Sequence, residues 1–308
     1  MKAALKLVTI IFLVSSLVIT LRHFTERKVI TETILAMGTT AKITIVIGNP
    51  AEEKVNSAYK AIVEAFTLLK TIEQSLSFYL RDGELQQINK NAGHAYVKIS
   101  DLMQEVLEKS LVYSKLTDGA FDVTATSLQK EGGYGSIVLN AKRKTVYFKN
   151  KKTKIDLGGI ATGFAIDKIA EHFKRLQIED YLIDVGGDVY AQGLNKNGEP
   201  WQVGVRNPVY QDRVIKKFSI TNLAVTTSGN YVKRHIVDPH SGKLAGSSLL
   251  SVSVIASTCL DADVLATAFF VMGIEKSKAF ISSERNDIKA LFIVDKQGSP
   301  KIITCNWD

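Results

Sequence analysis

Cysteine and proline are scarce in this chain. Its 308 residues contain five prolines and two cysteines, Cys259 and Cys305. Two cysteines this far apart exclude a disulfide framework and lack the spacing of a cysteine metal site, which leaves one disulfide or two small apolar side chains. The scarcity of proline, without any repeat or low-complexity stretch, excludes Pro-rich linkers. The sequence therefore predicts one domain over residues 29–308.

Charge of one sign is concentrated only at the N-terminus. The formal net charge is +8, and residues 1–28 carry +4 of it, so the other 280 residues carry only +4. A nucleic-acid-binding domain gathers its basic residues on one face. The weak charge of residues 29–308 argues against nucleic acid as a partner.

A basic start precedes an unbroken apolar run at residues 7–21. Fifteen residues are fewer than the roughly 20 that span a bilayer, but they fit the core of an export signal or a signal anchor. No small-x-small cleavage motif follows, and no cysteine nearby could take a lipid, which favours an uncleaved anchor. Basic residues flank both ends and leave the orientation open. We expect residues 1–28 to attach the chain to a membrane.

The remaining sequence mixes strand and helix patterns without strict alternation, which predicts an α+β fold. Alternating, β-branched segments predict strands, with a strand pair or bulged strand over 181–193 and a turn at residues 197–198. Apolar residues spaced by three and four predict helices, the second with Ser100 as N-cap and the last closed by Gly273. The predicted strands are 41–48, 144–150 and 249–256, and the predicted helices are 51–76, 101–116, a segment after the glycines up to Leu176, and 260–272.

The stretch DLGGIATGFAID, residues 156–167, contains three glycines, Gly158, Gly159 and Gly163. A strand, a glycine turn and a helix start together present free amides and a positive dipole end to an anion. A P-loop is excluded because Phe164 and Ala165 occupy the positions of its Lys and Ser/Thr. The order G-G-x-x-x-G also differs from the dinucleotide fingerprint. Taken alone, the stretch is either an anion site or a tight turn that needs glycine.

Two residue pairs have spacings that suit chemistry. Asp263 and Thr267 are four apart on a predicted helix and share a face, and such hard oxygen donors suit Mg²⁺. The alternative is an Asp stabilised by the helix dipole and a Thr bonded to a carbonyl. His235 and Asp238 are three apart in a turn before Pro239. They could handle protons or form a structural hydrogen bond.

Seven motifs in this order resemble those of one known family. The resemblance covers residues 33 to about 295 and is to the FAD:protein FMN transferases, the ApbE family. Each motif is weak alone, and the specificity lies in their number and order. They are AMGTTAKITI (36–45), LSFYLRDGELQQIN (76–89), TDGAFDVT (117–124), DLGGIATGFAID, IDVGGDVYAQG (183–193), TTSGNY with RHIVDPHSG (226–242), and DADVLATAFFVMG (261–273).

The resemblance implies an activity. Family members use Mg²⁺ to cleave the pyrophosphate of their substrate FAD, transfer FMN to a Thr or Ser hydroxyl of a partner protein and release AMP. The usual acceptors are flavoprotein subunits of membrane redox complexes, outside the cytoplasm. The resemblance thus implies a membrane-anchored enzyme facing the periplasm or cell exterior. A FAD pyrophosphatase using water as acceptor and a non-catalytic FAD-binding protein are the alternatives.

The resemblance also assigns roles to residues. It places a metal on the Gly159 carbonyl, Asp263 and Thr267, so the cation would supply the charge of the missing P-loop Lys. Asp263 and His235 are the implied catalytic residues, with His235 as the base for the acceptor hydroxyl. The implied flavin or nucleotide contacts are Met37, Tyr79, Ala120, Phe121, Asp122, Asp156, Thr162 and Ile236.

Three features depart from the family pattern. Thr162 stands where the family usually has Lys or Glu, and Asn230 stands where Asp is usual. Residues 127–140 replace a longer stretch that contains Pro and Trp. These departures do not remove any implied metal ligand.

Overall fold

The computed structural model describes residues 27–127, 133–230, 235–246, 248–296 and 298–307. The predicted anchor at residues 7–21 lies outside these ranges. Within them, no helix is both long enough and apolar enough to cross a membrane.

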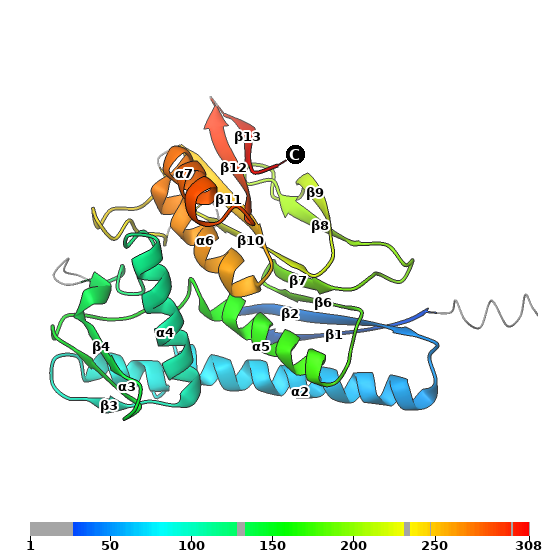
Figure 1. Ribbon diagram of the computed structural model, residues 1–308, viewed down its shortest axis with the longest axis horizontal. Helices are drawn as coiled ribbons and strands as arrows, with labels where there is room; N and C mark the ends of the chain where they lie inside the picture. Colours follow the sequence, from blue (N-terminus) through cyan, green and yellow to red (C-terminus); the bar gives the residue numbers. More distant parts are fainter. Residues whose placement is uncertain (1–26, 128–132, 231–234, 247, 297, 308) are drawn as a thin grey trace, which may run out of the picture.

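An antiparallel sheet of eight strands forms the centre of the fold, in the order β1-β2-β6-β7-β10-β11-β12-β13 (Figure 1). Its strands are β1 (Arg27–Ala36), β2 (Thr39–Gly48), β6 (Tyr181–Val185), β7 (Asp188–Gln192), β10 (Leu223–Gly229), β11 (Leu249–Ala256), β12 (Lys289–Lys296) and β13 (Ser299–Cys305). Two small sheets accompany it. They are β3 (Val97–Lys98), β5 (Thr145–Phe148) and β4 (Ile137–Asn140), and the hairpin of β8 (Trp201–Arg206) and β9 (Val214–Ile220).

The two faces of the large sheet pack against different partners. Because side chains alternate along a strand, Ile45 faces the helices, whereas its neighbour Val46 joins the core under the β8–β9 hairpin. At one end of α2, the helices α3 and α4 and the β3-β5-β4 sheet form a separate lobe (Figure 1). The helices are α2 (Glu52–Leu76), α3 (Glu84–Lys90), α4 (Asp101–Leu116), α5 (Ala161–Arg175), α6 (Cys259–Met272) and α7 (Ile274–Glu284), with a 3₁₀ turn η1 (Gly133–Ser136).

Local sequence patterns predicted the longer helices α2, α4, α5 and α6 and the strands β2, β5, β6, β7 and β11, but not the other strands or α3 and α7. Ser100 caps α4, its hydroxyl accepting the Met103 N–H at 3.1 Å, and α6 ends at Gly273, whose φ is +75°. Residues 181–193 form a strand pair, β6 and β7. One prediction was wrong, because α5 ends at Arg175 and leaves Leu176 45% exposed beyond the apolar face. The mixed α/β architecture agrees with the predicted α+β class.

The two cysteines are both free thiols. Cys259 is buried at the start of α6, and Cys305 is half-buried in β13. The structure therefore does not form the disulfide that the sequence left open. Cys259 serves as a small buried side chain, as the other alternative predicted.

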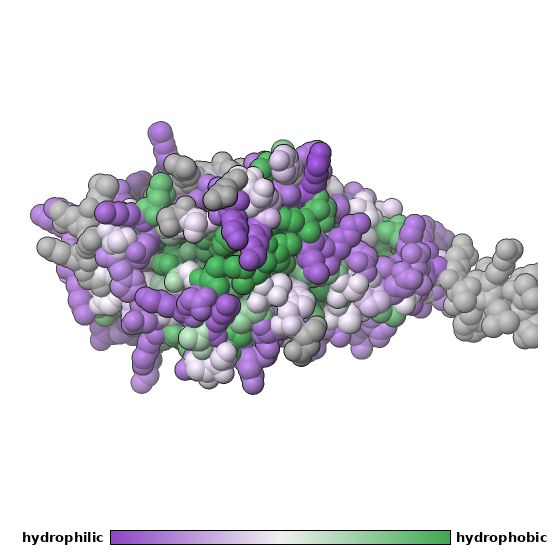
Figure 2. All heavy atoms as spheres, turned by 90° about the horizontal axis from the view of Figure 1, so that it is seen from above, coloured by the Kyte–Doolittle hydropathy of each residue, from purple (hydrophilic) through white to green (hydrophobic). Residues whose placement is uncertain are grey.

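The sheet ends at β13, and the chain then returns to the β8–β9 hairpin. Trp307 packs its ring on Phe218 of β9 with 5.0 Å between ring centroids. Seen from above, where β12, β13 and the hairpin come nearest to the viewer, the surface carries an apolar band bordered by hydrophilic side chains (Figure 2). The end of the chain thus closes the core beneath the hairpin.

Candidate active site

Helices α5 and α6 make their closest contact at Gly163. A Cβ built on Gly163 would lie 2.5 Å from the Cys259 carbonyl oxygen and 2.8 Å from the Asp263 Cβ, distances that no side chain tolerates. The Gly163 N–H donates to Asp263 Oδ2 at 3.0 Å. The third glycine of the quoted stretch therefore serves helix packing and orients a carboxylate.

The turn that contains Gly159 lies beside Thr267, one helical turn from Asp263 on α6. A Cβ on Gly159 would be 3.3 Å from the ring atom Cε2 of Phe121 and 3.5 Å from Thr267 Oγ1. The Thr267 hydroxyl is 3.0 Å from the Ser228 hydroxyl on β10. The structure thus gathers the three predicted metal ligands. Sequence analysis missed Ser228, although it lies inside the TTSGNY motif.

Negative charge accumulates at this helix contact. Asp263 is only 6% exposed, and burial raises its pKa to about 7, although the Gly163 N–H lowers it. Burial, together with the charge of Asp263, also raises the pKa of Asp188, a half-buried carboxyl at the start of β7. Sequence analysis missed Asp188 as well, because nothing local indicates that IDVGGDVYAQG reaches Asp263.

The oxygen donors at this point have the chemistry of a magnesium site. A carboxylate, a hydroxyl and a backbone carbonyl are hard ligands, and a divalent cation would offset the charge of the buried Asp263. The described residues contain no group of three or more His, Cys, Asp or Glu side chains arranged to hold a metal. Any cation here would therefore rely on hydroxyl, carbonyl or substrate oxygens in addition to Asp263.

Two predicted contact residues shape loops with their carboxylates. Asp122 Oδ1 accepts two hydrogen bonds from Thr124, one from its N–H at 2.8 Å and one from its hydroxyl at 2.7 Å. Asp122 Oδ2 accepts the Tyr134 N–H at 3.0 Å. Asp156 Oδ1 accepts the Gly158 N–H at 2.9 Å and so folds the glycine turn. These bonds fix the walls beside Gly159.

Other predicted contacts surround the same turn. Ala120 and Phe121 are buried, and Phe121 contributes the ring that borders Gly159. Thr162 is half-buried in the first turn of α5. The Gly159 turn therefore lies between the ring of Phe121 and Thr267 of α6.

Met37 and Tyr79 both lie near the C-terminal end of α2. Met37 forms the β1–β2 turn with a φ of +54°, and its N–H donates to Glu73 Oε1 at 2.6 Å, in the last turn of α2. Tyr79 follows α2 by three residues and is 77% exposed, with its ring edge-on to Phe78 at 5.8 Å. Tyr79 thus presents most of its ring to solvent.

A single side chain, Asn230, holds the segment that carries His235 and Ile236. Its Nδ2 donates to the carbonyls of Ile236 at 3.2 Å and Ala245 at 3.0 Å, and its Oδ1 accepts the N–H groups of His235 and Ile236, both at 3.0 Å. Only an amide both donates and accepts in this way. This gives the departure from the family's Asp a physical reason, because an ionised carboxylate could not donate to the two carbonyls.

His235 is exposed and lines a groove of about 1110 Å³ together with Asp188 and Gly229. The groove is also lined by Trp201 and Val203 of the β8–β9 hairpin, so it lies on the hairpin side of the large sheet. Asp238 contacts residues that follow it in the turn. Its Oδ1 accepts the backbone N–H of His240 at 2.9 Å and lies 3.5 Å from His240 Nδ1, and Ser241 also donates to this carboxylate. The predicted roles of the His235 and Asp238 pair, proton handling or a structural hydrogen bond, stay predictions.

Comparison with known proteins agrees with this geometry. The model of the ApbE family matches residues 37–292. The FAD:protein FMN transferase of Vibrio cholerae is 30% identical over 259 residues, which cover 74% of this chain and 77% of that protein. The FAD:protein FMN transferase of Treponema pallidum is 30% identical over 305 residues, covering 84% and 83%.

Solved structures share the whole fold. The flavin transferase ApbE from Vibrio cholerae matches with a TM-score of 0.77 at 26% identity, covering 91% of this chain and 97% of that one. The apo flavinyl transferase ApbE from Pseudomonas stutzeri also gives a TM-score of 0.77 at 26% identity, covering 91% and 95%. The fold and the relatives define an enzyme of the transferase class. The chain belongs to the ApbE family.

Proposed function

We propose that this chain is a magnesium-dependent FAD:protein FMN transferase, which moves FMN from FAD to a Thr or Ser hydroxyl of a partner flavoprotein and releases AMP. The observation that carries the proposal is that Gly159, in the turn before α5, lies beside Thr267, which is one helical turn from Asp263 on α6. The names of the curated relatives support the same reaction.

Three groups of the chain would hold Mg²⁺: the Asp263 carboxylate, the Thr267 hydroxyl and the Gly159 carbonyl. The cation, when bound, supplies positive charge to the FAD pyrophosphate and stabilises the departing AMP phosphate. Asp263 is suited to this role because its buried charge has only the Gly163 N–H as a described hydrogen-bond donor. The donor set therefore fits the cation.

The remaining residues bind the substrate and handle the proton. The exposed ring of Tyr79 and the thioether of Met37 suit the flat apolar face of an isoalloxazine. His235 would accept the proton of the acceptor hydroxyl, which is a poor nucleophile until it is deprotonated. Such proton transfer contributes roughly 10²–10⁴-fold to a rate. Asn230 fixes the backbone from which His235 extends.

The partner and the location extend this proposal. An uncleaved anchor in residues 1–28 would hold the enzyme at a membrane, facing the periplasm or cell exterior. This placement would bring it to a flavoprotein subunit of a membrane redox complex. The apolar run at residues 7–21 and its basic flanks support the anchor.

The direct test uses the full-length protein with FAD, Mg²⁺ and a flavin-carrier domain that contains an acceptor Thr. AMP release and flavin fluorescence on the denatured acceptor are followed together, with EDTA and a Thr→Ala acceptor as controls. AMP with a labelled acceptor supports the transferase. AMP without label in every acceptor tested identifies a FAD pyrophosphatase, and bound FAD without AMP identifies a binding protein.

A further inference from the structure

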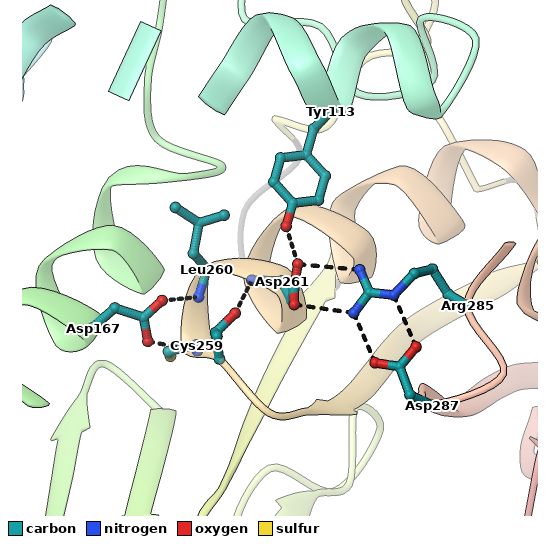
Figure 3. Close-up of polar contacts among 8 residues, drawn as sticks. Tyr113, Asp167, Cys259, Leu260, Asp261, Arg285 and Asp287 are labelled. Carbon is teal, nitrogen blue, oxygen red and sulfur yellow. Dashed lines mark hydrogen bonds and ion pairs between the residues drawn. The ribbon is translucent and has the colours of Figure 1, made fainter. Parts of the chain in front are cut away.

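Asp167 ends the quoted stretch DLGGIATGFAID and has no role in the proposed site. It lies on α5, one turn after Gly163, and faces the first turn of α6 (Figure 3). Its Oδ1 accepts the Cys259 N–H at 2.7 Å and its Oδ2 accepts the Leu260 N–H at 3.0 Å. One carboxylate of α5 thus binds the first two amides of α6.

These amides need an acceptor from outside their own helix. The first N–H groups of a helix have no intrahelical partner, and a carboxylate at that end also interacts favourably with the helix dipole. The hydroxyl of Thr258, the N-cap, accepts the Asp261 N–H at 3.1 Å, and its carbonyl accepts the Ala262 N–H at 3.2 Å, so neither group serves the first two amides. Asp167 supplies the acceptors for the Cys259 and Leu260 amides, which the Thr258 cap does not serve. Because both bonds come from one planar carboxylate, they fix both the separation and the rotation of α6 relative to α5.

The same two helices touch again one turn further along. There, Gly163 approaches α6 so closely that no Cβ fits, and its N–H reaches Asp263. Cys259 and Asp263 are four residues apart on α6, as are Gly163 and Asp167 on α5. The Asp167 contact and the Asp263 contact are therefore successive turns of one helix interface.

We propose that Asp167 is a positioning residue for the metal site: its carboxylate holds α6 against α5 so that Asp263 and Thr267 face the Gly159 carbonyl. This inference rests on the proposed magnesium site, but it concerns a residue outside the proposed set of metal ligands. Burial raises the pKa of Asp167 to about 6 even though both amides lower it. The carboxylate is half-buried, and this partial burial has a cost that an apolar side chain would not carry.

Asp261 provides the matched control. It lies in the same turn of α6 but faces the other way, toward the Tyr113 hydroxyl and the Arg285 guanidinium (Figure 3). Arg285 donates to its two oxygens at 3.2 and 3.0 Å and also pairs with Asp287 at 2.9 Å. The hydrogen bonds described for the Asp261 carboxylate therefore anchor α6 to α4 and to the segment after α7.

The experiment titrates Mg²⁺ alone into the full-length wild type, D167N, D167E and D261N by calorimetry. It also measures the Mg²⁺ concentration that half-saturates AMP release. Outer contacts that orient a metal ligand typically change affinity 10–100-fold, so D167N is expected to weaken Mg²⁺ binding about tenfold. The Mg²⁺ concentration that half-saturates AMP release is expected to rise by the same factor, with kcat recovering at saturating Mg²⁺.

Two further variants serve as comparisons. D167E keeps both carboxylate oxygens, and its Mg²⁺ affinity is expected to fall between those of wild type and D167N. D261N is expected to bind Mg²⁺ like wild type even where its melting temperature falls.

Wild-type affinity in D167N would overturn the inference, and so would an equal loss in D261N, since that would reveal a general effect of stability. If D167N does not fold, D167E decides, because wild-type affinity in D167E would contradict a role for the carboxylate's position. A wild-type protein that neither binds Mg²⁺ nor releases AMP would overturn the proposed function itself, an outcome distinct from unchanged binding in the variants.

Discussion

The backbone N–H of Gly163 donates to the Asp263 carboxylate across 3.0 Å, and the two residues are 100 positions apart in the chain. This contact joins α5, the helix that follows the glycine turn, to α6, which carries the predicted metal ligands Asp263 and Thr267. Two motifs that are separate in the sequence thereby become one site.

Replacing Gly163 by alanine should disturb this contact. The new Cβ would overlap the Cys259 carbonyl and the Asp263 Cβ, so α5 and α6 must separate. Overpacking of this kind costs roughly 1–3 kcal/mol, and Mg²⁺-dependent AMP release should fall with it. Urea unfolding and an AMP assay measure the two effects. Gly48→Ala, where nothing lies within 4 Å of the new Cβ, is the control and should change neither.

Asp263→Ala should abolish Mg²⁺-dependent turnover while the protein remains folded. The variant loses the one carboxylate of the proposed donor set, and the hydroxyl and carbonyl that remain are too weak to hold the cation. AMP release across a Mg²⁺ series, with circular dichroism as the folding control, tests this. Wild-type turnover at ordinary Mg²⁺ concentrations would refute the assignment of Asp263 as a ligand.

Asn230→Asp should destabilise the segment that carries His235. An ionised Asp keeps the two acceptor contacts but loses both donors, which leaves the carbonyls of Ile236 and Ala245 facing negative charge. Losing partners for such groups costs about 1–3 kcal/mol, and FMN transfer should slow more than FAD binding weakens. Urea unfolding, transfer rate and FAD affinity are measured.

Asn207 offers the matched control for that substitution. Its side-chain oxygen accepts the N–H groups of Val209 and Tyr210, at 2.9 and 3.0 Å, and a carboxylate performs this task equally well. Asn207→Asp should therefore leave stability nearly unchanged. A similar loss in both variants would attribute the effect to added charge instead of lost donors.

His235→Ala should slow transfer by roughly 10²–10⁴-fold and weaken FAD binding much less, because a base acts on the acceptor hydroxyl. Single-turnover transfer rates and FAD titrations separate these effects. His240→Ala should stay within a few-fold of wild type, since His240 is paired with Asp238. Equal losses of rate and FAD affinity in His235→Ala would make His235 a binding residue.

The half-buried Asp167 should make the free energy of unfolding depend on pH. Its folded-state pKa is raised from 3.8 to about 6, so the folded chain holds this proton more tightly than the unfolded chain. Stability from this group is therefore present below pH 4 and falls as pH rises from about 4 to 6, by at most about 3 kcal/mol. Urea unfolding of wild type and Asp167→Asn across pH 4–7 measures the difference. A difference that does not vary with pH would contradict the raised pKa.

Much of the fold follows from short-range sequence. The apolar face of α2, the Ser100 cap of α4 and the Gly273 end of α6 are local features, because each depends on residues within about one turn. The shared face of Asp263 and Thr267 also follows from their spacing alone. The family motifs added the expectation that Gly159 joins them, and the structure places it beside Thr267.

The sequence by itself determined the longer helices and several of the strands, and which residue types could carry the chemistry. Only the tertiary structure decided how they combine. It showed that Gly163 packs two helices, that Asp167 binds amides more than 90 positions away, that Asp188 lies near Asp263, and that Asn230 joins Ile236 to Ala245. These relationships arise where remote segments meet. The side-chain periodicity of a helix or a strand depends only on residues that are close along the chain, so no local sequence pattern could reveal these contacts.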